Sequence, residues 1–308
     1  MVDILMATYN GEKYIKNQIE SILNQTYKDW ILYIRDDGSK DNTKEIIKNF
    51  SNEYPNKIVF IEDEKRGLGA KSNFAELLKY SKSEYCMFCD QDDVWLDSKI
   101  DKTLLKMKES EKQYGKSTPI LLHTDLLVVN DNLEVISKSF FKYQNLNPNL
   151  TSINYLLVQN NVTGCTMMIN NSLKKLSIDI PGECIMHDWW IALVASAKGK
   201  IIFLNESTIK YRQHENNEVG AQNYKSINNI IRKAKNMKNN LKSIDNGIRQ
   251  AKCFYNIFND TLSESQYNCI KEYSTIKSNS FIKRKIIVNR YRFKKSGFLR
   301  NIVYYIFI

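Results

Sequence analysis

The sequence predicts an α/β fold, with a mostly parallel, doubly wound sheet flanked by helices and followed by a helical C-terminal extension. Three observations predict this architecture. Apolar runs of strand length alternate with amphipathic segments of helix length over the first 90 residues. Three of these runs end in polar residues. After residue 226, apolar residues recur at spacings of three and four, which is typical of a long amphipathic helix.

Length and composition bound the organisation of the chain. Its 308 residues can bury a large core, in one large domain or two smaller ones, and 43% hydrophobic residues with only 4 Pro indicate a globular protein. The net charge of +11 is unevenly distributed, because residues 225–308 hold 18 Lys and Arg against 4 Asp and Glu. We therefore expect a near-neutral domain over residues 1–222 and a basic helical extension over residues 223–308.

Four strands are expected where short apolar runs are bounded by turn residues. These runs are residues 3–8, 30–35, 58–61 and 85–89. Between them lie three segments with apolar residues on one helical face, around Ile19, Ile47 and Leu77. Strands that alternate with helices form a parallel sheet, and the ligands of such sheets bind beyond the carboxyl ends of the strands.

An acidic motif, Asp90-Gln91-Asp92-Asp93, follows the fourth strand directly. Mg²⁺ and Mn²⁺ prefer oxygen ligands, and Mg²⁺ often takes one or two carboxylates together with substrate phosphates. By itself the motif fits an acidic turn that caps the next helix equally well. Two more strands end in polar clusters, Thr8-Tyr9-Asn10 and Asp36-Asp37, at what should be the same edge of the sheet. This shared edge favours a site for a metal ion and a diphosphate.

Several classes of protein are disfavoured. The first turn lacks G-x-G-x-x-G, and no Walker lysine loop occurs, which argues against dinucleotide oxidoreductases and NTPases. Cys86 and Cys89 form a C-x-x-C inside an apolar strand, where small buried side chains are expected rather than redox or zinc chemistry. The chain begins without the pattern of a signal peptide and has no apolar run of roughly 20 residues. A reducing cytoplasm, or the inner face of the plasma membrane, is the expected location.

The second part of the sheet is expected between residues 120 and 211. An apolar run at 120–129 predicts a strand, in which His123 and Asp125 are interpreted as a packing pair rather than a catalytic one. A short helix, a loop and a strand should follow between 155 and 170. His187-Asp188-Trp189-Trp190 then begins a helix that Gly199 ends, and two strands are predicted at 201–204 and 208–211.

Together these motifs resemble the family 2 glycosyltransferases, inverting enzymes of the GT-A fold, with a Rossmann-like sheet. The resemblance covers residues 1–220 and is carried by Ala7-Thr8-Tyr9-Asn10, Asp36-Asp37-Gly38-Ser39, Asp90-Gln91-Asp92-Asp93 and His187-Asp188-Trp189-Trp190. Tyr211-Arg212-Gln213-His214 and Val219-Gly220-Ala221 are similar to the rhamnosyltransferase-like branch.

The resemblance implies a role for each matching residue. Asp37 would read the imide N–H of uracil or thymine, since a carboxylate is an acceptor. Asp92 would be the main ligand of Mn²⁺ or Mg²⁺, and Asp188 would be the catalytic base. The remaining nucleotide-binding residues would be Thr8, Tyr9, Lys71, Asn73 and Asp90. His214 would give a further metal contact, and Gly164, Trp189 and Trp95 would contact the acceptor.

The implied reaction is direct displacement at an anomeric carbon with inversion, within surface polysaccharide synthesis. The donor would be dTDP-rhamnose or a UDP-sugar, and the acceptor a saccharide, including a lipid-linked one. A sugar-1-phosphate nucleotidyltransferase is the first alternative, although the expected Gly-rich, Arg-containing first loop is missing. A non-catalytic scaffold at the membrane surface is the second.

The extension carries two patterns. The apolar seam from Ile227 to Phe258 spans more than four heptads, and it either folds back on the first domain, which we favour, or pairs with a second copy in a homo-oligomer. Basic and aromatic residues interleave from Phe281 to Ile308, which suits an anionic bilayer surface or a solvated basic cap. Nucleic acid is disfavoured as a partner because no recognised nucleic-acid-binding fold is present.

Overall fold

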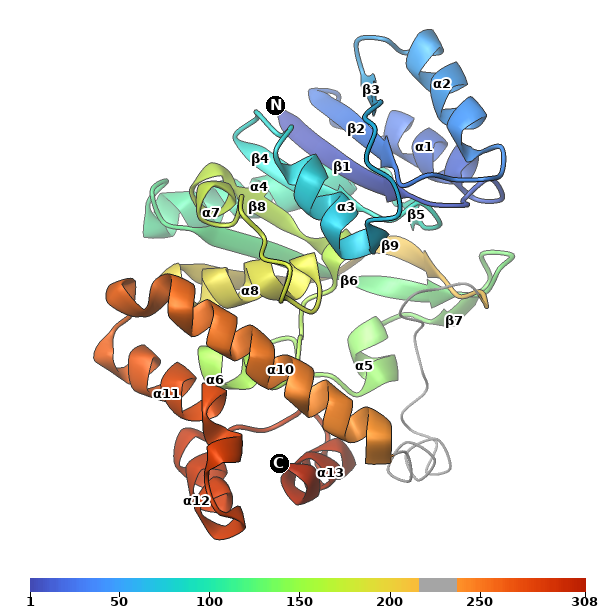
Figure 1. The fold of residues 1–308 in the computed structure, drawn as a ribbon. Coiled ribbons are helices and arrows are strands. Elements are labelled where there is room, and N and C mark those ends of the chain that lie inside the picture. Colours follow the sequence, from blue (N-terminus) through green and yellow to red (C-terminus); the bar gives the residue numbers. More distant parts are fainter. Residues whose placement is uncertain (216–236) are drawn as a thin grey trace.

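A mixed sheet forms the centre of the molecule (Figure 1). This computed structural model describes residues 1–215 and 237–308. Within those ranges the sheet has nine strands in the order β3-β2-β1-β4-β8-β6-β9-β5, with β7 paired to β6. The strands are β1 (Val2–Thr8), β2 (Trp30–Asp36), β3 (Ile58–Ile61), β4 (Tyr85–Cys89), β5 (Val94–Trp95), β6 (Ile120–Val129), β7 (Val135–Ser137), β8 (Met168–Asn170) and β9 (Lys200–Arg212).

The first four strands form the predicted parallel half of the sheet. β1 pairs in parallel with both β2 and β4, and β2 pairs in parallel with β3. The register places Thr8 opposite Asp36 and Met6 opposite Cys89. The residues that follow β1, β2 and β4 therefore emerge at one edge, which confirms the expected convergence of these strand ends.

The other strands close the sheet differently from the prediction. β8 is antiparallel to both β4 and β6, while β9 is parallel to β6 and antiparallel to β5. The two strands predicted at 201–204 and 208–211 are one strand, so that prediction was wrong. Shifts in the β6–β9 register beside Thr124 and Asp125 take up the polar residues between the two apolar runs, and pairing then continues.

Helices cover both faces of the sheet (Figure 1). The helices of the described residues are α1 (Ile15–Leu23), α2 (Thr43–Glu53), α3 (Gly69–Leu78), α4 (Lys99–Tyr114), α5 (Phe140–Gln144), α6 (Ile153–Leu156), α7 (Asn171–Leu176), α8 (His187–Lys198), α10 (Met237–Phe258), α11 (Glu264–Ser274), α12 (Phe281–Tyr291) and α13 (Phe298–Phe307). None of the helices in the described ranges is long and apolar enough to cross a bilayer.

Alternation along the strands divides the buried residues into two cores. Phe88 of β4 packs with α3 and α8, whereas its neighbour Met87 packs with α1 and α4 on the opposite face. Cys86 and Cys89 also belong to different cores, because residues three apart in a strand point to opposite faces. The C-x-x-C is therefore not a thiol pair, and burial raises the pKa of Cys86 to about 12.

His123 and Asp125 do not contact each other through their side chains in the described contacts. His123 is fully buried beside Phe141 and Phe203, and burial lowers the pKa of its imidazole to about 3. The Asp125 carboxylate instead accepts hydrogen bonds from Ser139 and from the backbone N–H of Phe140 at the start of α5. Both residues are structural, and the interpretation of a shared packing pair was wrong in detail.

The extension folds back on the rest of the chain. α10 buries Ile244, Ala251 and Phe254, and the Phe254 ring lies 5.4 Å from the ring of Trp190 in α8. The Gln250 side chain accepts a hydrogen bond from the backbone N–H of Ile185 at 2.8 Å. Ile227, Ile230 and Ala234 of the predicted seam lie outside the described residues, as does the predicted domain boundary at residues 222–223.

The junction after α8 requires glycine. A Cβ atom on Gly199 would lie 1.8 Å from the backbone oxygen of Pro119, which is too close for any side chain. Gly199→Ala is therefore expected to lower the free energy of unfolding by about 3 kcal/mol, at the upper end for overpacking. Denaturant titration measures this loss, and Gly182→Ala is the matched control because its Cβ would meet no atom within 4 Å. Equal stability of the two variants would contradict the expectation.

Candidate active site

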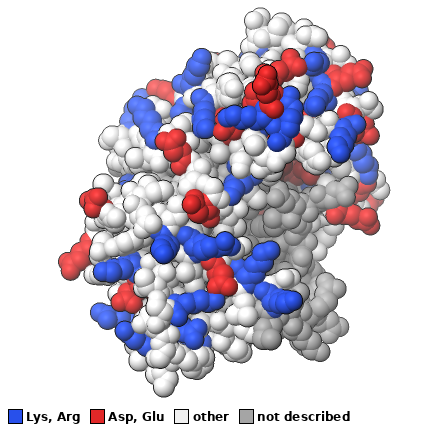
Figure 2. Space-filling view, viewed as in Figure 1, with Lys and Arg blue, Asp and Glu red and all other residues white. Residues whose placement is uncertain are grey.

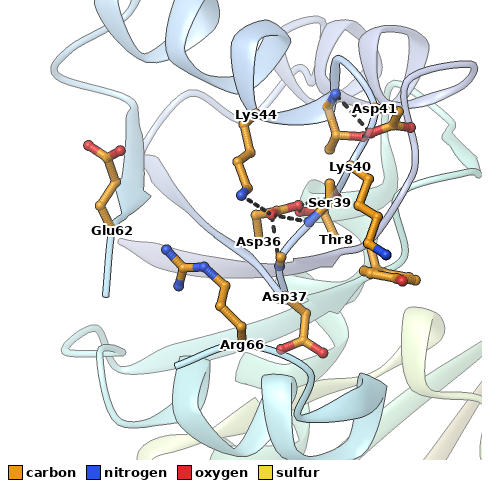
Figure 3. A network of polar contacts seen from close by, with 12 residues as sticks. Thr8, Asp36, Asp37, Ser39, Lys40, Asp41, Lys44, Glu62 and Arg66 are labelled. Carbon is orange, nitrogen blue, oxygen red and sulfur yellow. Dashed lines mark hydrogen bonds and ion pairs between the residues drawn. The ribbon is translucent and has the colours of Figure 1, made fainter. Parts of the chain in front are cut away.

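Two neighbouring carboxylates after β2 have different surroundings. Asp36 is buried and accepts hydrogen bonds from the N–H groups of Gly38 and Ser39, at 3.0 and 2.8 Å, and from the Thr8 hydroxyl at 3.1 Å. Figure 3 shows the carboxylate of Asp37 pointing away from this network. Asp36 therefore fixes the turn that follows β2, and Thr8 ties this turn to the end of β1.

Asp37 holds the loop that precedes α3. Its two carboxylate oxygens accept hydrogen bonds from the N–H groups of Leu68 and Gly69, at 2.9 and 2.8 Å. The guanidinium of Arg35 lies 3.5 Å from the same carboxylate. Gly69 has a φ of +75°, which L side chains rarely adopt, so the loop depends on glycine there.

Asn73 lies behind this loop, and its predicted contact with the nucleotide is wrong. The side chain is 1% exposed, because its amide oxygen accepts from Arg35 Nη1 at 2.9 Å and its amide nitrogen donates to the Arg35 carbonyl at 3.2 Å. Arg35 also makes two hydrogen bonds to the Asp63 carboxylate, at 2.9 and 2.8 Å. Asn73 therefore satisfies a buried guanidinium and is not directed at a ligand.

The acidic motif after β4 is completed by residues that follow β9. His214 Nε2 lies 2.8 Å from Asp92 Oδ2, and the Arg212 guanidinium donates to the Asp92 carbonyl at 2.9 Å. The backbone N–H of Arg212 donates to the Asp93 carboxylate at 3.2 Å. Tyr14 stacks on the His214 ring with the ring centroids 4.7 Å apart. The structure thus brings the two predicted metal ligands, Asp92 and His214, together.

Two fully buried ionisable residues, Asp93 and Lys99, lie in the core beneath this edge of the sheet. Asp93 is fully buried, and burial, followed by repulsion from Asp92 and Asp90, raises the pKa of its carboxyl well above the usual range. Lys99 of α4 is also fully buried, and burial lowers the pKa of its ammonium to about 8. Sequence analysis assigns no role to Asp93, Lys99 or Arg212. Asp93 and Arg212 could have been recognised as candidates because they lie inside the acidic motif and the Tyr211–His214 motif.

Two groups of side chains here offer atoms that could bind a metal ion. Asp90, Asp93 and Cys165 place one donor atom each within 4.8 Å of one another, but burial raises the pKa of Asp93 and Cys165 well above their usual values. Protonated groups are poor ligands. Asp92 and His214 keep 15% and 11% of their side chains exposed. A carboxylate oxygen and an imidazole nitrogen suit Mn²⁺ better than Mg²⁺, which prefers oxygen ligands.

Asp188 is the second residue of α8. Burial raises the pKa of its carboxyl to about 6, while the N–H groups of Trp189 and Gly164, at 2.6 and 3.1 Å, stabilise the ionised form. A Cβ atom on Gly164 would lie 3.2 Å from the His187 ring and 3.4 Å from Asp188, so a small residue suits this position. A carboxylate with this pKa is ionised at neutral pH and is basic enough to accept a proton.

The two tryptophans after Asp188 have different surroundings. Trp190 is buried against α10, whereas Trp189 is partly exposed and donates its indole N–H to the Leu156 carbonyl at 2.6 Å. Trp189 lines a shallow hollow of about 230 Å³ between α8 and α10. The other lining residues are Ile185, Asn239, Lys242, Ser243 and Asn246.

Trp95 cannot have the acceptor-binding role predicted for it. Its side chain is 1% exposed and packs in the core on the α1 and α4 face of the sheet. The Lys99 ammonium lies 4.6 Å from the centre of its ring. The family resemblance implied a role at the surface for Trp95, but this side chain points inward from β5, which pairs with β9.

Several contacts join the remaining site residues along one edge. The Gln91 amide makes two hydrogen bonds to the backbone of Tyr9, which connects the ends of β1 and β4. The Lys71 ammonium donates to the carbonyls of Gly182 and Cys184, which connects α3 to the loop before α8. Gly164, which contacts Asp188, is followed by Cys165, whose thiol lies near Asp90. Gly164 and Cys165 therefore link the base candidate to the acidic motif.

Known proteins are similar to this chain in sequence. Residues 3–176 match the family described as "Glycosyl transferase family 2". The dTDP-rhamnosyl transferase RfbG of Shigella flexneri is 31% identical over 248 residues, which are 75% of this chain and 76% of that protein. A glucosyltransferase of Escherichia coli, WfgD, is 28% identical over 173 residues, which are 56% of this chain and 61% of that protein.

Solved glycosyltransferase structures share the fold. S. aureus TarS (residues 1–349) in complex with UDP superposes with a TM-score of 0.54 at 17% identity. The superposition covers 94% of this chain and 78% of the TarS chain. The mannosyltransferase PcManGT from Pyrobaculum calidifontis, in complex with GDP-Man and Mn²⁺, gives a TM-score of 0.55 at 11% identity, covering 94% and 72%.

Proposed function

The chain belongs to the family 2 glycosyltransferases, and on that premise we propose that it transfers a sugar, with inversion, from a nucleoside-diphosphate sugar to a saccharide acceptor. The observation that carries this proposal is the position of Asp188, a buried carboxylate joined through Gly164 and Cys165 to the acidic motif after β4. Direct displacement at an anomeric carbon needs a base next to the group that binds the departing diphosphate.

The donor would lie across the ends of β1, β2 and β4. Asp37 Oδ1 accepts one backbone N–H and also faces Arg35, whereas Oδ2 accepts one backbone N–H and keeps a second lone pair, which can accept the imide N–H of uracil or thymine. Thr8 and Tyr9 would border the base, and Asp90 would hold the ribose. Lys71, now bonded to two carbonyls, would lie near the diphosphate. The RfbG relative is named for a dTDP-rhamnosyl donor, which supports a thymine or uracil nucleotide.

The chemistry is divided between Asp188 and the acidic motif. Asp188 accepts the proton of the acceptor hydroxyl as that oxygen attacks the anomeric carbon, and the N–H groups of Gly164 and Trp189 keep the carboxylate in position. Asp92 and His214 would hold Mn²⁺, which when bound supplies positive charge for the departing diphosphate. The Mn²⁺ complex of the PcManGT neighbour supports that choice of ion.

The acceptor would bind at the hollow beside Trp189. An aromatic ring edged by amide and hydroxyl side chains is suited to a saccharide, and Lys242 adds a cation. A cation at this place suits the diphosphate of a lipid-linked acceptor. The name of the WfgD relative specifies a diphosphoundecaprenol-linked acceptor, which supports that class and a reaction at the cytoplasmic face of a membrane.

A panel of donors tests the proposal. The purified protein is heated with UDP-, dTDP- or GDP-sugars in the presence of Mn²⁺ or Mg²⁺, and donor consumption is measured in parallel. A true donor at 100 times its Kd should stabilise the fold by about 2.7 kcal/mol, and we expect this only for a uracil or thymine nucleotide, with the larger effect in Mn²⁺. Release of pyrophosphate from a nucleoside triphosphate and a sugar-1-phosphate would instead indicate a nucleotidyltransferase.

A further inference from the structure

The last two helices of the chain expose apolar side chains that nothing in the described structure covers. On α13, Phe298, Leu299, Ile302, Tyr305 and Ile306 fall at i, i+1, i+4, i+7 and i+8, and all five are exposed. This spacing places them in one stripe along the helix. Phe298 is 78% exposed, while Tyr304 on the opposite side of α13 is buried. Helix α13 is thus anchored by one side and presents an apolar stripe to its surroundings.

Helix α12 continues this apolar surface. Its exposed apolar residues are Phe281, Ile282 and Ile286, whereas Ile287 and Val288 face the core. The Lys285 ammonium lies 4.5 Å from the Phe281 ring and 4.7 Å from the Tyr305 ring, so it sits between the two helices. Asn289 also donates to the Tyr305 hydroxyl at 3.4 Å. We call the exposed apolar residues of these two helices the α12–α13 face.

The charged residues in the segment that carries the α12–α13 face all have one sign. Residues 273–308 contain nine Lys and Arg and no Asp or Glu. Lys283, Arg290, Arg292 and Lys294 are exposed. Figure 2 shows Lys and Arg gathered over the part of the molecule where the C-terminal helices lie in Figure 1. A soluble protein partner with an apolar groove would not require this excess of positive charge.

We propose that the α12–α13 face binds an anionic phospholipid bilayer. Exposed Phe, Ile and Leu side chains enter the boundary between headgroups and acyl chains, and the surrounding Lys and Arg side chains contact lipid phosphates. The helices lie in the plane of the surface, because neither is long enough to cross it. Membrane binding itself does not depend on the proposed function. If the bound membrane also supplies a lipid-linked acceptor to Asp188, that second step rests on the proposed function.

Vesicle sedimentation of the full-length protein tests this proposal. The wild type should sediment with vesicles of phosphatidylglycerol and phosphatidylcholine, and far less with phosphatidylcholine alone. Phe298→Ser combined with Ile302→Ser and Ile306→Ser should weaken partitioning at least tenfold. Val135→Ser with Ile136→Ser is the matched control, because these exposed apolar residues lie on β7 and should not change binding. Lys283→Gln with Arg290→Gln should lower binding by about fivefold for each charge removed.

The outcomes separate membrane binding from catalysis. The triple serine variant should consume donor like the wild type in the absence of vesicles, since the three residues lie outside the candidate active site. Absence of wild-type binding to anionic vesicles, or unchanged binding of the triple variant, would overturn the proposal. It would also fail if the wild type forms dimers without lipid and the triple variant is a monomer, because a second copy would then cover the face. If the wild type binds anionic vesicles but does not transfer sugar, the proposed function is wrong and the membrane proposal still holds.

Discussion

Asp188→Asn is expected to lower the rate of sugar transfer by about 10²–10⁴-fold, the range that general bases contribute. The amide keeps the size of the carboxylate but cannot accept a proton. The Gly164 and Trp189 N–H groups donate to different oxygens of Asp188, so the one oxygen of the amide keeps only one of these two hydrogen bonds. The initial rate of transfer at saturating donor measures the effect. Transfer at more than about a tenth of the wild-type rate would show that another group is the base.

Two further measurements separate catalysis from folding. The wild-type rate should rise with pH through about 6, the raised pKa of Asp188, because only the ionised carboxylate is a base. The folded state binds this proton more tightly than the unfolded state, where the pKa has the usual value of 3.8. The Asp188 contribution to stability therefore decreases as pH rises from 3.8 through 6. Asp188→Asn lacks that loss, so its Tm relative to that of the wild type should rise as the pH increases from 3.8 through 6.

Asp92→Asn should have a comparably large effect. Removing the carboxylate takes away the charge that balances a divalent ion, and we expect transfer to decrease by about 10²–10³-fold, since charge stabilisation by a metal supplies several kcal/mol. A second readout is independent of turnover: Mn²⁺ should raise the Tm of the wild type but not that of the variant. Titration with Mn²⁺ followed by calorimetry measures both the affinity and its loss.

A matched substitution five residues downstream controls for Asp92→Asn. Asp97 is exposed, and Asp97→Asn makes the same chemical change outside the site, so it should leave Mn²⁺ binding and transfer as in the wild type. His214→Gln should weaken Mn²⁺ binding less than Asp92→Asn, because it removes a neutral ligand rather than a charge. If Asp92→Asn binds Mn²⁺ as well as the wild type does, the metal ligand is Asp90 rather than Asp92.

The parallel half of the fold could be read from the sequence because each of its signals is local. The strands at Ile58–Ile61, Tyr85–Cys89 and Ile120–Val129 have the predicted bounds, since each apolar run is bounded by turn residues. The family motifs predict site roles for Asp92, Asp188 and His214, and the structure brings Asp92 and His214 within hydrogen-bonding distance.

The errors concern side-chain direction and distant partners. Asn73 and Trp95 lie next to site residues in sequence, yet one supports Arg35, 38 residues away, and the other fills a core. The spacing of apolar residues does not predict the contacts of Asn73 and Trp95, because these contacts depend on which face of the backbone turns inward. The burial of Lys99 beneath the acidic motif was hidden for the same reason, since lysine is almost never fully buried without partners.

The strand β9 also sets the order in which this protein can be assembled during translation. Asp92 leaves the ribosome about 120 residues before Arg212 and His214, which at synthesis rates of roughly 5–20 residues per second is a delay of about 6–24 s. Until β9 is made, β6 is a long apolar edge strand of the nascent chain. Exposed edges of this kind invite aggregation. Chaperone capture should therefore be strongest on nascent chains that end shortly before residue 200.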